Sequence, residues 1–207
     1  MEGGPAPTQW QPVPTYFERL AEEGVSSAVV SPARFAGSGL TGAALRGARH
    51  VPADTLEQRV SAALRELRAG TPVVYLYWSE IDHSGHAHGV ASDAWIGQVE
   101  QFDAGLAMLM RGLPSGVRVV LTADHGMINV EPDRIIDVAS TPVLREGVRI
   151  VAGETRAAHV HAEEGRADEV EERWRETLGE SAWVLSRAQM PALIGEGSGA
   201  SVIGDLL

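Results

Sequence analysis

Residues 72–90 read PVVYLYWSEIDHSGHAHGV, and this stretch decides the fold class. Its first part, Val73–Trp78, is a continuous run of apolar, β-branched and aromatic residues, as expected for a strand covered on both faces. The polar, histidine-rich part from Ser79 to Val90 is predicted to be a loop. Downstream, Ser92 can cap a long helix, and Val117–Leu121 is a second apolar run. Strand, loop, helix and strand make a βαβ unit, so the two apolar runs are predicted to be parallel strands of one sheet.

Shorter elements are predicted on the N-terminal side of this unit. Thr15 and Glu18 have the spacing of a capping box, which predicts a helix that begins there. Residues 28–30 are a short β-type run. Residues 32–54 are rich in glycine and small residues and are predicted to be a long loop with at most one turn of helix. Asp54 is predicted to open the next helix, which keeps a helical apolar period.

The pattern changes in the C-terminal third of the chain. Residues 147–152 and 156–161 flank a Gly-Glu-Thr turn and are predicted to form a hairpin. A strongly charged helix is expected over residues 166–178, and residues 182–185 are a candidate for a further strand. The fold class is therefore α/β, with a mostly parallel sheet flanked by helices and a small hairpin-plus-helix portion.

We expect one domain over residues 1–207. Its parts are a core at 13–138, a hairpin and helix portion at 139–190, and a flexible, glycine-rich tail at 191–207. This length agrees with one domain of ordinary size.

Composition excludes several classes of protein. Seventeen Lys and Arg against 28 Asp and Glu give a net charge of −11, and an acidic surface repels nucleic-acid backbones and anionic membranes. The absence of cysteine excludes disulfides, thiolate zinc sites and cysteine nucleophiles. The longest apolar run is far below the ~20 residues of a membrane span, and no secretory signal is visible. We therefore expect a cytoplasmic protein with no membrane span.

Two polar clusters follow the two predicted buried strands. The first is Asp82-His83-Ser-Gly-His86-Ala-His88, and the second contains Asp124 and His125. Ligands of open α/β sheets bind outside the carboxyl ends of the strands, so both clusters are expected at one rim. Carboxylates and imidazoles together are the ligand set of zinc or manganese. The sequence thus predicts a metal site at this rim, formed by two carboxylates and at least two imidazoles.

Other interpretations of the histidines are also open. His86 and His88 form a His-x-His pair, which would suit a mononuclear hydrolase. His159 and His161 alternate on a predicted strand and share one face, which favours a structural or surface role. His50 is expected to be a plain loop residue. The clusters themselves could be a solvated loop and a turn, although their joint occurrence at two strand ends favours a site.

The two clusters also carry a resemblance to a known family. Asp82-x-x-Gly-His86-x-x-Gly, followed by Ala-Asp124-His125-Gly-Met, resembles the metal motifs of the type I phosphodiesterase/nucleotide pyrophosphatase branch of the alkaline phosphatase superfamily. The resemblance covers roughly residues 8–190, with further similar stretches at 10–15, 32–40, 75–78 and 151–156.

This resemblance implies a fold, a cofactor and a reaction. The fold would be part of an alkaline-phosphatase-like core. Asp82 and His86 would hold one divalent ion, and Asp124 and His125 the other, the ions being zinc or manganese. The reaction would be hydrolysis of phosphodiester, pyrophosphate or phosphomonoester bonds in a small substrate such as a nucleotide.

The chain departs from the family pattern at the nucleophile and at two ligands. The family carries an aspartate ligand and a nucleophilic Thr or Ser on a preceding segment, and a third histidine in a later His-Gly motif. Ser79 and Thr122 lie near the predicted rim but do not match the nucleophile, so no catalytic residue is assigned. His159 or His161 could replace the third histidine only if the hairpin folds over the rim.

These departures predict either a truncated chain or a non-catalytic remnant that keeps the fold and weak metal binding. In both cases the isolated chain is expected to show negligible hydrolysis. Uncovered surfaces are expected to permit self-association.

Overall fold

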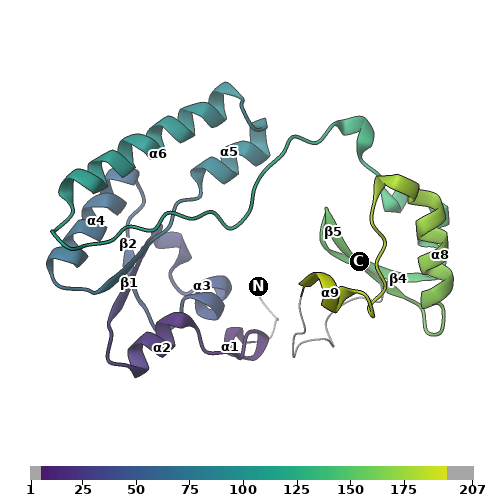
Figure 1. Cartoon of the computed structure of the whole chain (residues 1–207), viewed down its shortest axis with the longest axis horizontal. Helices are drawn as coiled ribbons and strands as arrows, with labels where there is room; N and C mark the ends of the chain where they lie inside the picture. The colour runs from purple at the N-terminus through teal and green to yellow at the C-terminus, as the bar shows by residue number, and fades with distance from the viewer. Residues whose placement is uncertain (1–5, 195–207) are drawn as a thin grey trace. The chain divides into compact units, whose positions relative to one another are not determined.

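The computed structural model describes residues 6–194 of the chain. The chain divides into two compact units, Met1–Asn129 and Val130–Leu207, and Figure 1 labels many of their helices and strands. The prediction of one domain, with a core that ends at residue 138, stays a prediction. Helix α9 (Met190–Ile194) includes the first four residues of the tail predicted at 191–207, and residues 195–207 lie outside the described residues.

A three-stranded parallel sheet forms the centre of the first unit. Its strands are β1 (Ser27–Ser31), β2 (Arg49–Pro52) and β3 (Val73–Leu76), in the order β2-β1-β3. All five residues of β1 are buried, whereas β2 and β3 lie at the edges and are only partly buried. The predicted α/β class with a parallel sheet is confirmed.

Helices cover both faces of this sheet (Figure 1). On one face, Val30 of β1 packs with Ala62 and Ala63 of α4, and Leu109 of α6 lies against the same cluster. On the other face, Phe17 of α2 meets Tyr75 of β3 edge-on, with ring centroids 6.2 Å apart. The helices of this unit are α1 (Pro7–Trp10), α2 (Tyr16–Glu22), η1 (Ala33–Phe35), α3 (Gly39–Ala44), α4 (Leu56–Arg68), α5 (Glu80–His88) and α6 (Asp93–Gly112).

Helix caps account for where these helices begin. The predicted capping box of Thr15 and Glu18 is confirmed at α2, and the Ser92 side chain caps α6 as predicted. The predicted cap at Asp54 is wrong by one residue, because the Thr55 side chain accepts a hydrogen bond from the N–H of Gln58 in the first turn of α4. The Asp54 carboxylate instead accepts a hydrogen bond of 2.9 Å from the N–H of Ala33.

The predicted loop at residues 32–54 is wrong as well, because it contains η1, α3 and the strand β2. Among the described strands, β2 has a partner on one side only, and a short edge strand gives no strong local apolar pattern. His50, expected to be a loop residue, lies on β2. Its Nε2 atom is 2.8 Å from the hydroxyl of Ser31 on the neighbouring strand.

The second predicted strand of the βαβ unit is also absent. Residues 117–121 run as irregular chain and form no ladder with β3 in the part of the chain that the structure describes. Val120 and Leu121 are 81% and 63% exposed, so the apolar run is not buried. A strand exists only where its backbone groups find a neighbour, and apolar composition alone does not supply one.

An antiparallel hairpin forms the second unit, as predicted. Its strands are β4 (Val148–Glu154) and β5 (Ala157–Ala162), and helix α8 (Ala167–Leu178) is the predicted charged helix. The Trp174 ring of α8 packs in the core and donates a 3.0 Å hydrogen bond to the carbonyl of Leu144. The remaining short helices are η2 (Pro132–Arg134), η3 (Val138–Ser140), α7 (Pro142–Arg145) and η4 (Gly179–Ser181).

The candidate strand at residues 182–185 is not formed. Val184 lies buried in the core of this unit, and its carbonyl accepts hydrogen bonds of 3.2 and 3.0 Å from the Arg175 side chain. The Arg175 side chain therefore satisfies a backbone carbonyl that a strand would pair with a neighbouring strand.

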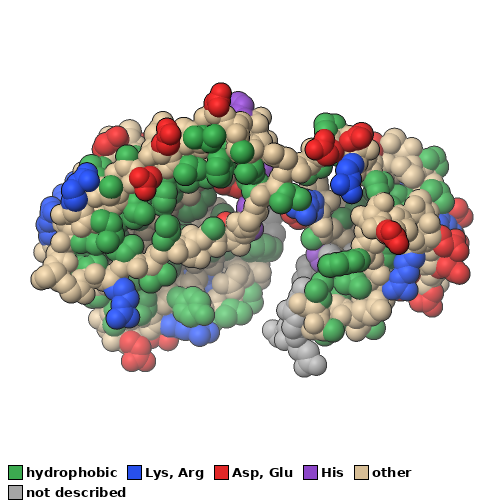
Figure 2. All heavy atoms as spheres, turned by 45° about the horizontal axis from the view of Figure 1, so that its top comes forward, with side chains coloured by type: hydrophobic (Ala, Val, Ile, Leu, Met, Phe, Trp, Pro, Cys, Tyr) green, Lys and Arg blue, Asp and Glu red, His purple; other side chains and the backbone are tan. Residues whose placement is uncertain are grey.

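Hydrophobic side chains reach the surface on the face seen in Figure 2. Among the exposed hydrophobic residues of the chain are Val120 of the first unit and Trp183 of the second, which is 85% exposed. Within residues 6–194, no helix has the length and apolar character needed to cross a membrane.

Candidate metal centre

The first polar cluster lies on helix α5, not on the predicted loop. Acidic residues stand in the first turn of this helix and histidines in the last, which suits the helix dipole. Gly89 ends the helix with a φ of 86°, a conformation that favours glycine. Asp82 and His86 are four positions apart on this helix, and residues at that spacing lie on one helix face.

The four predicted donors lie together in the first unit. Asp82 Oδ1 is 3.4 Å from His86 Nε2 and 3.8 Å from His125 Nε2. His125 Nε2 is also 3.8 Å from Asp124 Oδ1. The predicted convergence of the two clusters is therefore present, although the strand expected to produce it is absent. His125 lies within 3.8 Å of a carboxylate from each cluster.

The donor set can be compared with what a zinc ion requires. Two tetrahedral ligands, each about 2.0–2.1 Å from zinc, lie about 3.4 Å apart, and the Asp82–His86 pair has this spacing. Within the described residues, however, no three His, Asp or Glu side chains are grouped so that they could hold one ion. The side chains are thus of the chemical type that binds divalent metals, and they are grouped as pairs rather than as sets of three. All four side chains are about half exposed or more.

The same helix geometry bears on the His-x-His interpretation. His86 and His88 are two positions apart on α5, and residues at this spacing do not face each other on a helix. A mononuclear site built on this pair alone is therefore not supported.

The loop that carries Asp124 and His125 is fixed to α5 at two points. The Asn129 side chain hydrogen bonds to both backbone groups of Val90. The Met127 side chain lies so close to Gly85 that a Cβ on this glycine would overlap the sulfur. These contacts were not predicted from the sequence. The glycine at position 85 could have indicated one of them, because it leaves room for the Met127 side chain.

The start of α5 is fixed by a buried arginine. Arg59 of α4 is 1% exposed and forms hydrogen bonds of 2.6 and 3.1 Å to the two carboxylate oxygens of Glu80. Its guanidinium also donates to the carbonyls of Ala53 and Asp54 and lies 4.6 Å from the centre of the Trp78 ring. The residue therefore connects α4 to the first turn of the donor-bearing helix.

Tyr75 belongs to the apolar run that is predicted to be covered on both faces, but its side chain is not fully buried. It is 41% exposed on strand β3. Burial, followed by the neighbouring Tyr77 and the negative charge of Asp124, raises the pKa of Tyr75 above its ordinary value. The electrostatic influence of the second cluster thus extends to β3.

Neither hydroxyl considered near the rim makes a short hydrogen bond to a base that would activate it. The Thr122 hydroxyl donates to the carbonyl of Ala123 at 3.1 Å. The Ser79 hydroxyl faces a Glu80 carboxylate oxygen at 3.5 Å, a long distance for a hydrogen bond. These contacts give no sign of an activated nucleophile.

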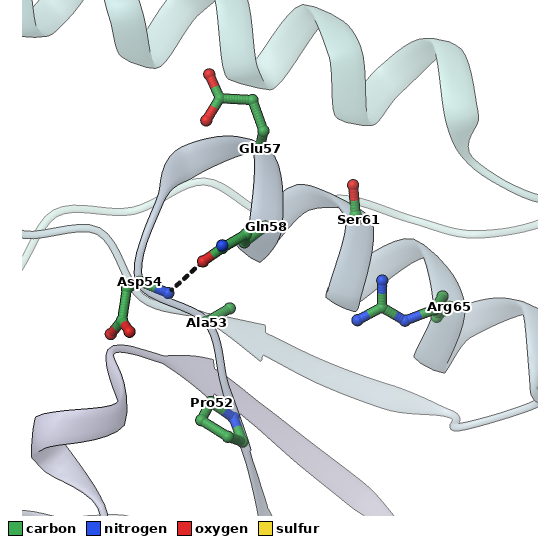
Figure 3. A pocket seen from close by; sticks show the side chains of 7 residues that line it. All are labelled: Pro52, Ala53, Asp54, Glu57, Gln58, Ser61 and Arg65. Atoms are coloured by element: carbon green, nitrogen blue, oxygen red, sulfur yellow. Dashed lines mark hydrogen bonds between the residues drawn. The ribbon is translucent and has the colours of Figure 1, made fainter.

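A pocket of about 460 Å³ lies elsewhere in the first unit, beside the end of β2 and the first turns of α4. Figure 3 shows that its polar side chains do not point to a common centre: Glu57 points away from Asp54. The Gln58 side chain is engaged with the N–H of Asp54. None of the four predicted donors lines this pocket.

The fold is that of an α/β protein with a parallel sheet, and the carboxylates and imidazoles lie beyond the end of one strand, where ligands of open α/β sheets bind. Residues 3–207 match the family model described as Type I phosphodiesterase / nucleotide pyrophosphatase. The chain belongs to this family. Its members are generally metal-dependent, with two divalent ions.

Known relatives agree with this assignment. The bis(5'-adenosyl)-triphosphatase ENPP4 of Bos taurus is 30% identical over 96 residues, which are 42% of this chain and 21% of ENPP4. Murine ectonucleotide pyrophosphatase/phosphodiesterase 5 (ENPP5) superposes with a TM-score of 0.63 at 20% identity. An inactive variant of ENPP5 in complex with AMP gives a TM-score of 0.64, also at 20% identity.

Both superpositions cover 92% of this chain and 52% of ENPP5. The chain therefore spans about half the length of these solved relatives. At this identity the likeness shows the fold, and the alkaline-phosphatase-like α/β core that the resemblance implied is confirmed.

Proposed function

We propose that this chain supplies metal ligands to a hydrolase of phosphodiester or pyrophosphate bonds. Asp82, His86, Asp124 and His125 would hold two divalent ions, with zinc as the proposed metal. Convergence of these side chains, with Asp82 Oδ1 within 3.8 Å of both imidazoles, is the observation that carries the proposal. Family membership supports the reaction class.

Each of the four residues has a task in this proposal. Asp82 and His86 present one oxygen and one nitrogen from the same helix face, so they bind as a preset pair. Asp124 and His125 present the second pair from a loop. When bound, the two ions would polarise a phosphoryl oxygen and neutralise charge that develops during displacement. The exposed position of the four side chains would leave a phosphorylated substrate free to approach.

Nucleotides are the proposed substrate class. The support is that ENPP5 has been solved with AMP and that ENPP4 is named as a bis(5'-adenosyl)-triphosphatase. Phosphomonoesters remain a second substrate class of the same chemistry. We also propose, from the sequence, that the chain is cytoplasmic and that it self-associates through exposed apolar residues.

A non-catalytic chain that keeps the fold and binds metal weakly is the second candidate. It is favoured by the finding that the donors among the described residues occur in pairs rather than in sets of three. The hydrogen bonds of Ser79 and Thr122 also mark neither residue as a nucleophile. Under either candidate, we expect the 207-residue chain to bind zinc weakly and to hydrolyse nitrophenyl phosphates negligibly.

Zinc titration by competition with a chromogenic chelator tests the proposal. His86→Ala and Asp124→Asn should each lower the zinc affinity at least ~10-fold, because each removes a ligand. His88→Ala is the matched control, an exposed histidine two residues along the same helix. Equal losses in His86→Ala and His88→Ala would point to nonspecific histidine binding and refute the assigned ligands. Hydrolysis near ~1 s⁻¹ that disappears in Asp124→Asn would refute the non-catalytic candidate.

A further inference from the structure

The segment from residue 117 to residue 131 has no regular secondary structure, and it nevertheless carries half of the candidate centre. Asp124 is 92% exposed and His125 is 55% exposed, so burial does not fix either side chain. Some contact must therefore hold this loop against α5 if His125 is to remain 3.8 Å from Asp82.

Asn129 makes such a contact. Its Oδ1 accepts a hydrogen bond of 2.7 Å from the N–H of Val90, and its Nδ2 donates one of 3.1 Å to the carbonyl of Val90. The amide side chain thus pairs with both backbone groups of one residue, as a neighbouring strand would do. Val90 follows Gly89, the residue that ends α5, and the two partners are 39 positions apart in sequence.

Gly89 makes room for this arrangement. A Cβ at this position would lie 3.0 Å from Asn129 Oδ1, closer than side chains normally approach. The positive φ of Gly89 turns the chain out of α5 just before Val90. The end of the helix is therefore shaped so that the asparagine amide can reach the backbone.

We propose that Asn129 is a positioning residue, which clamps the loop of Asp124 and His125 onto the end of α5 and so brings the two donor pairs together. The role in metal binding rests on the proposed function, whereas the clamp itself does not. Asn129 is exposed, so its removal should leave the fold of this unit intact. Changes to residues that orient metal ligands typically cost 10- to 100-fold in metal affinity.

A distance measurement without metal tests the clamp directly. The chain has no cysteine, so Ala87→Cys on α5 and Ala123→Cys in the loop can carry two spin labels, both at exposed positions. Pulsed electron resonance should give a narrow distance distribution in this background and a broad one after Asn129→Ala. Ile128→Ala is the matched control, since Ile128 is a 60% exposed neighbour in the same loop. An unchanged distribution in Asn129→Ala would overturn the proposal.

Asn129→Asp separates the two hydrogen bonds of the clamp. An aspartate oxygen can still accept from Val90 N–H, but its second oxygen would face the Val90 carbonyl and could not donate. We expect this variant to broaden the distribution as Asn129→Ala does. A narrow distribution would show that the donated bond is not needed and overturn the two-bond clamp.

Zinc titration then separates this proposal from the proposed function. Zinc affinity should fall at least ~10-fold in Asn129→Ala and stay unchanged in Ile128→Ala. If the unmodified chain binds no zinc while Asn129→Ala still broadens the distances, the metal assignment fails and the clamp stands. If the unmodified chain binds zinc and Asn129→Ala binds it equally well, the positioning role fails and the metal assignment stands.

Discussion

Replacing Arg59 by methionine should loosen the first turn of α5 while leaving the second unit unchanged. The guanidinium is 1% exposed and holds the Glu80 carboxylate through two hydrogen bonds. Methionine has a similar length and fills the same buried space, so the change mainly removes charge and donors. The carbonyls of Ala53 and Asp54 lose their donor as well.

The size of the effect follows from the burial of the two partners. Removing one partner of a fully buried ion pair costs about 3–5 kcal/mol. Glu80 is 33% exposed and can regain water when Arg59 is gone, so a smaller cost of about 2–3 kcal/mol is expected. At about 1.4 kcal/mol per tenfold change, this corresponds to a roughly 30- to 150-fold increase in local opening.

Hydrogen exchange followed by mass spectrometry measures this opening separately in each part of the chain. Peptides from α4 and α5 should exchange faster in Arg59→Met, whereas peptides from residues 157–178 serve as an internal control. Arg59→Lys keeps the charge but loses the planar two-pronged donor, so an intermediate effect is expected. Exchange in Arg59→Met within about threefold of the unmodified chain would refute a structural role for this ion pair.

Two further changes probe the loop contact and the charged helix. Gly85→Ala should push the Met127 side chain aside and weaken the docking of the loop by about 1–2 kcal/mol. Hydrogen exchange at residues 122–130 should then become faster. If the overlap is the cause, adding Met127→Ala should restore part of the loss. Hydrogen bonds from two arginines lower the pKa of Glu169 to about 2 from an ordinary 4.5, so its stabilising contribution is complete above pH 4.5 and is lost as the pH falls toward 2. Glu169→Gln should remove this acid-sensitive part of stability in melting curves recorded from about pH 2 to 7, and Glu172→Gln on the same helix should keep it.

Much of the local structure of this protein is determined by its sequence. The capping box at Thr15, the cap at Ser92 and the hairpin of the second unit depend on residues close to one another in the chain, so local patterns predicted them correctly. The apolar run at residues 73–76 likewise forms a strand, because it pairs with the fully buried β1. Residue type and position after two apolar runs pointed to the two polar clusters, and the family resemblance named four candidate donors within them.

Tertiary structure decided how these donors meet. The sequence predicted that two adjacent parallel strands would bring both clusters to one rim, but residues 117–121 find no neighbouring strand among the described residues. Asp82 and His86 instead share a helix face, and Asn129 ties the other cluster to the end of that helix. Such contacts join residues that are 39 positions apart, and their formation depends on where each backbone group finds a partner, which local composition does not specify.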